Sequence, residues 1–202
     1  MRIWGLQDTY KSWIVLDMAW NVAQGKDWLV FPTNMNTVLL INTELPKPMY
    51  HERWCIMAKT RKYCPENLYI ITDLSLKLDT KQGLASLYSW VTQINPGLII
   101  VDNLGRSFAG DLNQGQAVNR FLDTLAIIRT DFGSAFVFVH HSRKQLWDLV
   151  KGRPIQQGIE DATGSKSLTN NVSTAFEIRK MQTQGAPDVV TVIPSKATFQ
   201  GT

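Results

Sequence analysis

Residues 5–12, with the sequence GLQDTYKS, have the residue types and spacing of a phosphate-binding loop. The usual pattern is Gly, four residues, Gly-Lys and then Ser or Thr, and Gly5, Lys11 and Ser12 stand at the required positions. In such a loop the backbone N–H groups surround the phosphates, the lysine ammonium reaches the β and γ oxygens, and the hydroxyl binds Mg²⁺. A helix that begins directly after the loop adds the positive end of its dipole. The pattern therefore predicts a nucleotide site.

Tyr10 departs from this pattern, because glycine usually precedes the lysine. Glycine is favoured there since the backbone passes close to phosphate and can require a conformation that a side chain resists. A basic helix N-terminus without a ligand is the alternative interpretation. The candidate nucleotide-binding residues are Gly5, Leu6, Gln7, Asp8, Thr9, Tyr10, Lys11, Ser12 and Trp13.

Two carboxylates follow apolar runs that are typical of buried strands. Asp102 ends the run at 98–102, and Glu44 comes just after the run at 37–42. Ligands of open parallel sheets bind beyond the carboxyl ends of the strands, so Asp102 is a candidate for holding Mg²⁺ through its water shell. Glu44 is placed to orient or deprotonate an attacking water, and Asn103 at the other possible base position favours this role. The alternatives are a carboxylate that caps the loop after its strand and a surface glutamate.

A histidine pair follows the third apolar run, at 135–139. Either His140 or His141 could donate a hydrogen bond to the γ-phosphate and report its presence to the next segment. A structural role is one alternative. Zinc is another, although no cysteine or third histidine completes such a site. Residues 164–167, GSKS, repeat the Lys-Ser pair, but no buried strand precedes them, so they do not predict a second phosphate loop.

The spacing of apolar residues predicts the elements that position these side chains. Apolar residues three and four apart predict a helix over 12–24, and Gly25 is a good helix end. Further helices are expected at 48–62, 80–93 and 116–130, and strands at 1–4, 37–42, 68–71, 98–102 and 135–139. This alternation predicts a parallel sheet with helices on both faces. The polar segment 142–171 shows little periodicity, and the last two strands are expected at 173–180 and 188–193.

The composition limits the class of protein. The 202 residues suit one α/β domain, and 44% hydrophobic with 19% charged residues is typical of a soluble globular protein. A net charge of +4 permits a polyanionic partner without requiring one. No apolar run reaches the length of a membrane span and no signal peptide is present, which favours the cytoplasm and no membrane partner.

Three further features concern the cysteines and the chain ends. Cys55 and Cys64 do not form a metal-ligand pattern, and a reduced thiol pair is expected. The first strand is short, and the C-terminal residues 199–202, FQGT, stop abruptly. We therefore expect residues 1–202 to be a single domain that is trimmed at one or both ends.

Taken together, these residues resemble the RecA-like P-loop ATPases, and more narrowly the plasmid and phage replicative helicases of the RepA type. The resemblance covers nearly the whole chain. Besides the phosphate loop, it rests on residues 16–19, 42–45, 99–104, 139–142 with Lys144, 164–165 with Leu168, and 195–197. It implies a RecA-like domain with a mostly parallel central sheet, helices on both faces and antiparallel strands at the C-terminal end.

The resemblance also implies the cofactors and roles. ATP and Mg²⁺ are the expected cofactors. The implied roles are phosphate and Mg²⁺ binding by Lys11 and Ser12, catalytic glutamate for Glu44, Walker B aspartate for Asp102, and sensor for His141 with His140 as second choice. Related ATPases form homo-oligomeric rings, commonly hexamers, with each ATP at a subunit interface.

Two basic residues are candidates for reaching a neighbouring subunit's nucleotide. Lys196 matches a basic residue with this role, but no arginine follows it where related helicases carry their arginine finger. Arg179 is a substitute. Because loss of such a finger costs 10³–10⁵ in rate in related NTPases, ATP binding is a firmer expectation than fast hydrolysis.

Single-stranded DNA is the expected macromolecular partner. Segment 143–180 has seven basic and four acidic residues, and in RecA-like rings the loops after the sensor strand line the channel. The candidate DNA contacts are Arg143, Lys151, Arg153 and Lys166, with Trp147 available for base stacking. A solvated lid is the alternative interpretation of this segment.

The sequence therefore predicts an Mg²⁺-dependent ATPase that acts as the motor domain of a phage or plasmid DNA helicase. One alternative is an ATP-switched recombination or repair mediator that does not unwind DNA. Another is a degenerate scaffold that does not hydrolyse ATP, in which Tyr10 closes the phosphate loop.

Overall fold

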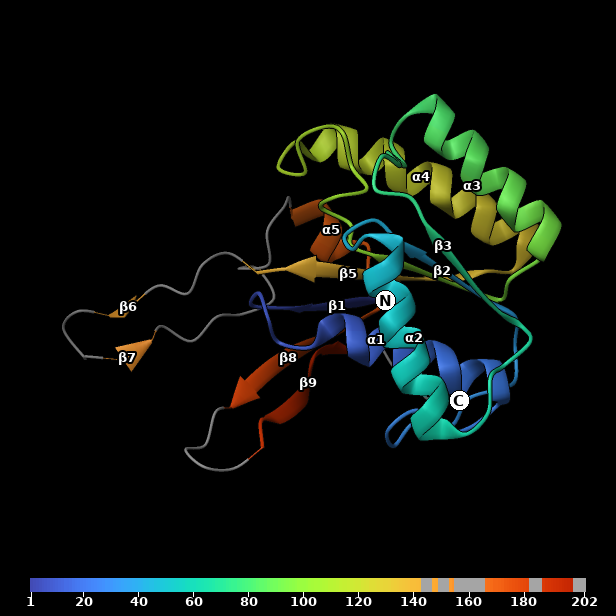
Figure 1. Cartoon of the computed structure of the whole chain (residues 1–202). Helices are drawn as coiled ribbons and strands as arrows, with labels where there is room; N and C mark the ends of the chain where they lie inside the picture. Colours follow the sequence, from blue (N-terminus) through green and yellow to red (C-terminus); the bar gives the residue numbers. More distant parts are fainter. Residues whose placement is uncertain (143–146, 149–152, 155–165, 182–186, 198–202) are drawn as a thin grey trace.

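A computed structural model describes residues 1–142, 147–148, 153–154, 166–181 and 187–197 of the chain (Figure 1). Its centre is a seven-stranded sheet in the order β3-β2-β4-β5-β1-β8-β9. The elements are β1 Arg2–Gly5, α1 Lys11–Gln24, β2 Val38–Asn42, α2 Lys47–Arg61, β3 Leu68–Thr72, α3 Lys81–Ile94, β4 Leu98–Asp102, α4 Gly115–Phe132, β5 Ala135–His141, β6 Trp147–Asp148, β7 Arg153–Pro154, α5 Lys166–Asn170, β8 Thr174–Met181 and β9 Val189–Ala197.

The expected helices and strands are confirmed, with ends within a few residues of those predicted. The first helix ends at Gly25, whose φ of 64° is the left-handed conformation that glycine adopts without cost. Strand β5, predicted to end at residue 139, continues through His140 to His141. The sequence did not indicate α5 or the short antiparallel pair β6–β7, because the polar segment around them carries little periodicity.

The sheet is parallel from β3 through to β8, and only β9 runs antiparallel, against β8. Helices α1 and α2 cover one face, and α3, α4 and α5 cover the other (Figure 1). Every residue of β2 and β4 is buried, as expected for parallel strands covered on both faces. The parallel strands all end at the left edge of the sheet in Figure 1, where the loop after β1 also lies.

Two hydrophobic cores lie on the two faces of this sheet. Alternate residues of each strand point to opposite faces, so Leu40 packs with Trp20 of α1 on one face. Its neighbour Leu39 packs with Leu87 of α3 and Phe121 of α4 on the other. The strands are thus held from both sides, which fixes the positions of the residues at their ends.

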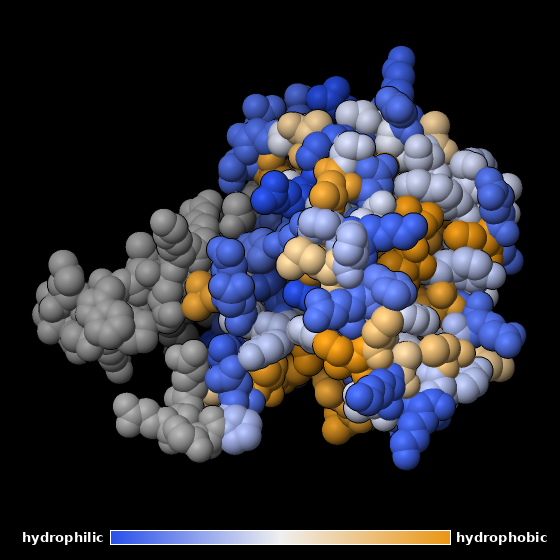
Figure 2. Space-filling model, in the orientation of Figure 1, coloured by the Kyte–Doolittle hydropathy of each residue, from blue (hydrophilic) through white to orange (hydrophobic). Residues whose placement is uncertain are grey.

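The exposed surface is mixed in character. On the face in Figure 2, hydrophobic side chains lie in several separate groups between hydrophilic ones. Among the described residues, no helix is long and apolar enough to cross a membrane.

Candidate nucleotide-binding site

In the loop between β1 and α1, a tyrosine occupies the position where the motif usually has glycine, in a backbone conformation that glycine adopts readily. Tyr10 is the residue before the helix, and its φ of 63° and ψ of 19° lie in the left-handed region. That conformation costs a residue with a side chain roughly 1–2 kcal/mol. Tyr10 is 39% exposed and its hydroxyl donates a hydrogen bond to Asp188 just before β9, so its side chain extends from the loop toward the last two strands.

Gly5 at the start of the loop is required by its neighbour strand. A Cβ atom on Gly5 would lie 2.4 Å from the carbonyl oxygen of Ile178 in β8, a separation that real Cβ atoms do not show. The glycine therefore permits the close approach of β1 and β8 where the loop begins.

Lys11 is buried in the loop, with only 4% of its surface exposed. Its ammonium group donates hydrogen bonds to the carbonyl oxygen of Leu6 and, over 3.2 Å, to Thr9 Oγ1. Burial lowers the pKa of Lys11 to about 8, although the charges of Asp102 and Glu44 oppose this effect. A buried cation held by neutral groups of its own loop favours the approach of an anion.

Asp102 ends β4 opposite Asn42 of β2 and is 1% exposed. Burial raises its pKa to about 6, while a hydrogen bond from the Ser12 hydroxyl acts in the opposite direction. The carboxylate oxygen Oδ1 has no hydrogen-bond partner among the described residues, which is unusual for a buried polar atom. Carboxylate and hydroxyl oxygens are ligands that suit Mg²⁺ and its water shell, so Ser12 and Asp102 fit this ion.

Glu44, Asn103 and His141 form a hydrogen-bonded group at the ends of β2, β4 and β5. Asn103 Nδ2 donates to Glu44 Oε2 over 2.7 Å and lies 3.1 Å from His141 Nε2. Asn103 Oδ1 accepts from the backbone N–H of Arg106 over 2.9 Å, which orients the amide. The His141 and Asn103 hydrogen bonds lower the pKa of Glu44, against the effect of its burial. Glu44 is therefore ionised at neutral pH.

The histidine pair is divided between two environments, because successive residues of a strand face opposite sides. His141 Nε2 lies 3.5 Å from Glu44 Oε1, and His141 lines the cavity above the phosphate loop. His140 is 2% exposed and is not among the residues that line this cavity. The geometry thus favours His141 over His140 as the candidate sensor.

The phosphate loop and this hydrogen-bonded group open into one cavity of about 420 Å³, within the range of ligand pockets. The residues lining it are Gln7, Asp8, Thr9, Tyr10, Lys11, Ser12, Trp13, Glu44, Leu45, Arg53, Val139, His141 and Lys180. Of the loop residues predicted from sequence, Gly5 and Leu6 do not line it. Arg53 and Lys180 were not predicted, since their places on a helix and near a strand end carry no motif. The Arg53 guanidinium lies 5.4 Å from the centre of the Trp13 ring.

The two basic residues predicted to reach a neighbouring subunit's nucleotide, Arg179 and Lys196, make hydrogen bonds within this chain. Arg179 is paired with Glu177 through two hydrogen bonds of 2.7 and 2.8 Å. The Lys196 ammonium donates to the carbonyl oxygens of Thr169 and Asn170, at the end of α5, over 2.9 and 3.2 Å.

The candidate DNA contacts lie outside the part of the chain whose side chains the structure describes. This holds for Arg143, Lys151, Arg153 and Lys166, for Trp147, and for Lys144 and residues 164–165 of the family resemblance.

The comparisons with known proteins show the family and the fold of this chain. A family model described as an AAA domain matches residues 1–146. The chain belongs to this AAA-domain family. No curated protein matches it. Among solved structures, the ATPase domain of another protein is similar, with a TM-score of 0.66 and 15% sequence identity over 97% of this chain and 76% of that one. The AAA-domain chain therefore has the predicted RecA-like P-loop ATPase fold.

Proposed function

We propose that this AAA-domain chain hydrolyses ATP with Mg²⁺ as the motor domain of a DNA helicase. The observation that carries the ATPase is the single cavity shared by Lys11, Ser12, Glu44 and His141, with Asp102 buried beside Ser12. A phosphate-binding cation, a set of Mg²⁺ ligands and a carboxylate for water are the parts that phosphoryl transfer needs.

The phosphate loop and the Mg²⁺ ligands bind the triphosphate. Lys11 turns from Leu6 and Thr9 toward the β and γ oxygens, whose charge stabilises its ammonium form. Ser12 and Asp102 would hold Mg²⁺, and the bound ion would supply positive charge against the charge that develops on the phosphates. Because Asp102 is buried and has a raised pKa, a divalent cation also relieves the cost of its ionisation.

Glu44 orients the attacking water in this proposal. The oxygen of water bonds to the γ-phosphorus as the bond to the β–γ bridging oxygen breaks, and the water proton passes toward the Glu44 carboxylate. ADP leaves with the electron pair of the broken bond. Asn103 Nδ2 holds the Glu44 carboxylate by donating to it and lies 3.1 Å from His141 Nε2, so it positions both groups, and His141 contacts the γ-phosphate.

The helicase role rests on the family resemblance and the basic segment after β5, and single-stranded DNA and a ring of this chain are the proposed partners. A scaffold with a closed loop is less well supported, because Tyr10 forms part of the cavity wall with Lys11 and Ser12. ATP hydrolysis and DNA action are separable and need separate measurements.

The first experiment measures ATP binding and turnover with Mg²⁺, with and without single-stranded DNA, for the native chain and Glu44→Gln. Glu52→Gln, on the exposed side of α2, is the matched control. We expect native turnover to rise with DNA, Glu44→Gln to bind ATP without turnover, and the control to behave as native. Strand displacement on a forked duplex then tests the helicase role.

Two results would contradict the proposal in different ways. If Glu44→Gln hydrolyses ATP at the native rate, Glu44 does not take part in hydrolysis. Turnover without any DNA response or strand displacement would keep the ATPase and leave the helicase role unsupported.

A further inference from the structure

Three side chains join the phosphate loop to the last two strands. The Tyr10 hydroxyl donates a hydrogen bond of 2.7 Å to Asp188 Oδ2, just before β9. The same oxygen accepts from Lys180 Nζ, on β8, over 2.8 Å. The Lys180 ammonium also lies 5.2 Å from the centre of the Tyr10 ring, within the range of a cation–π contact. Each residue thus contacts the other two.

This cluster of Tyr10, Lys180 and Asp188 lies on one particular side of the phosphate loop. The loop leaves β1, which stands between β5 and β8 in the sheet. Glu44, Asp102 and His141 come from the β5 side, at the ends of β2, β4 and β5. Lys180 comes from β8, on the other side, and still lines the same cavity.

The direction of a bound nucleotide follows from this order. The groups that meet water and Mg²⁺ lie on the β5 side, so the γ-phosphate faces that way. The non-reacting end, with the α-phosphate and the nucleoside, then extends toward β8. Lys180 is the basic residue that the β8 side contributes to the lining of the cavity.

We propose that Lys180 binds the non-reacting end of the nucleotide, at the α-phosphate and nucleoside, and that Tyr10 and Asp188 position its ammonium group. This inference rests on the proposed nucleotide site. A lysine side chain is long and flexible, and here Asp188 holds its end over the Tyr10 ring. An ammonium group has three donors, so it can keep these contacts while it donates to a phosphate oxygen.

The cluster also gives a physical reason for tyrosine at a glycine position. The left-handed backbone at Tyr10 costs a residue with a side chain roughly 1–2 kcal/mol. Glycine would avoid that cost but could supply neither the ring face nor the hydroxyl. The tyrosine therefore serves the site through Lys180, as a positioning residue.

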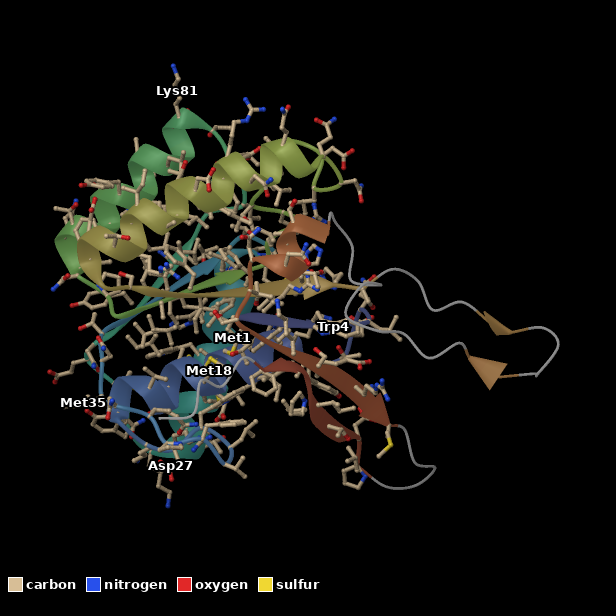
Figure 3. All side chains as sticks on the ribbon, turned by 180° about the vertical axis from the view of Figure 1, so that it is seen from behind. Met1, Trp4, Met18, Asp27, Met35 and Lys81 are labelled. Atoms are coloured by element: carbon tan, nitrogen blue, oxygen red, sulfur yellow. The ribbon has the colours of Figure 1, made fainter. Side chains whose placement is uncertain are left out.

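The test compares Lys180→Met with Lys81→Met, which removes a lysine at the start of α3 that points away from the sheet (Figure 3). Calorimetry measures the dissociation constants of ADP and ATPγS with Mg²⁺. Since the two ligands share the non-reacting end, we expect Lys180→Met to weaken both by a similar factor, about tenfold for one charge-assisted hydrogen bond. Lys180→Arg is expected to recover most of the affinity, and Lys81→Met to bind as native.

Other outcomes overturn the inference. If Lys180→Met binds both ligands as Lys81→Met does, Lys180 does not contact nucleotide. If only ATPγS weakens, Lys180 acts at the γ-phosphate instead. Thermal unfolding without nucleotide shows whether Lys180→Met is folded, and Lys180→Gln replaces it if it is not. Absence of binding by the native chain would instead refute the nucleotide site itself, which separates the two failures.

Discussion

Two ionisable residues of the candidate site, Lys11 and Asp102, are buried. Lys11 and Asp102 are both nearly inaccessible to water, and burial moves their pKa values toward neutrality, to about 8 and about 6. Desolvation disfavours the charged form of each group. A phosphate beside the lysine and a cation beside the aspartate would therefore stabilise the charged forms of both groups.

The raised pKa of Asp102 predicts how stability depends on pH. Because its folded-state pKa of about 6 lies above the ordinary value of 3.8, its stabilising contribution is full below that ordinary value and is lost as pH rises through about 6. We expect the free energy of unfolding of Asp102→Asn, relative to native, to rise by up to about 3 kcal/mol between about pH 4 and pH 7.

Urea unfolding with EDTA and without nucleotide measures this difference. Asp27→Asn is the control, since Asp27 is exposed on the far side of the molecule from the site (Figure 3). If the difference in free energy of unfolding between Asp102→Asn and native stays constant across this pH range, the pKa of Asp102 is not raised in the folded protein.

The contacts of Asn103 predict that its replacement affects ATP turnover and leaves ATP binding nearly unchanged. Its amide contacts the two groups proposed to act on water and γ-phosphate, Glu44 and His141, and does not line the cavity. Asn103→Ala should leave ATP affinity near native and lower turnover on the order of 10²-fold, because misplaced catalytic groups lose that much. Steady-state kinetics with equilibrium binding checks this, with exposed Asn34→Ala as control. An equal loss of affinity would indicate general damage to the site.

At the scale of elements, the close approach of backbones decides where glycine is needed. Gly83 lies in the first turn of α3, where the Thr80 side chain caps the helix. A Cβ atom there would lie 1.9 Å from the carbonyl oxygen of Lys77. The turn before α3 therefore packs against the helix at a distance that only glycine allows.

Gly83→Ala should destabilise the protein, although alanine is the better helix former by roughly 0.5–1 kcal/mol. The overpacked contact costs about 1–3 kcal/mol, so we expect a net loss of free energy of unfolding in urea titrations. The control is Gly115→Ala at the start of α4, where a Cβ would meet a Ser167 hydroxyl at 3.3 Å that can give way. Greater stability of Gly83→Ala would mean that the turn relaxes freely.

At the scale of the whole molecule, the cavity joins residues from many parts of the chain, so a ligand there links them. A nucleotide that binds only the folded state adds about 2.7 kcal/mol of stability at one hundred times its dissociation constant. For a chain of this size we expect Mg²⁺–ATPγS to raise Tm by roughly 5–10 °C. Scanning fluorimetry measures the shift. Lys11→Ala should show little of it, and an equal shift in that variant would place the ligand elsewhere.

The sequence was sufficient to predict the seven-stranded sheet, helices α1 to α4 and the edge where the candidate site lies. Apolar periodicity indicates elements because it reflects burial on one or two faces. The loop motif, Glu44 and Asp102 could be placed together because parallel strands end at one edge. The sequence could not show that Asn103 faces Glu44 and His141, since those contacts span 59 and 38 positions.

The sequence by itself thus determined the fold class and predicted the residues of the candidate site, through patterns that depend on neighbours along the chain. Only the tertiary structure decided which histidine reaches the cavity, and that Lys180 of β8 contacts Tyr10 of the phosphate loop. The physical reason is that side-chain direction and strand order depend on packing between distant segments. A tyrosine that departs from a motif when viewed locally is, in three dimensions, a contact between the phosphate loop and the last two strands.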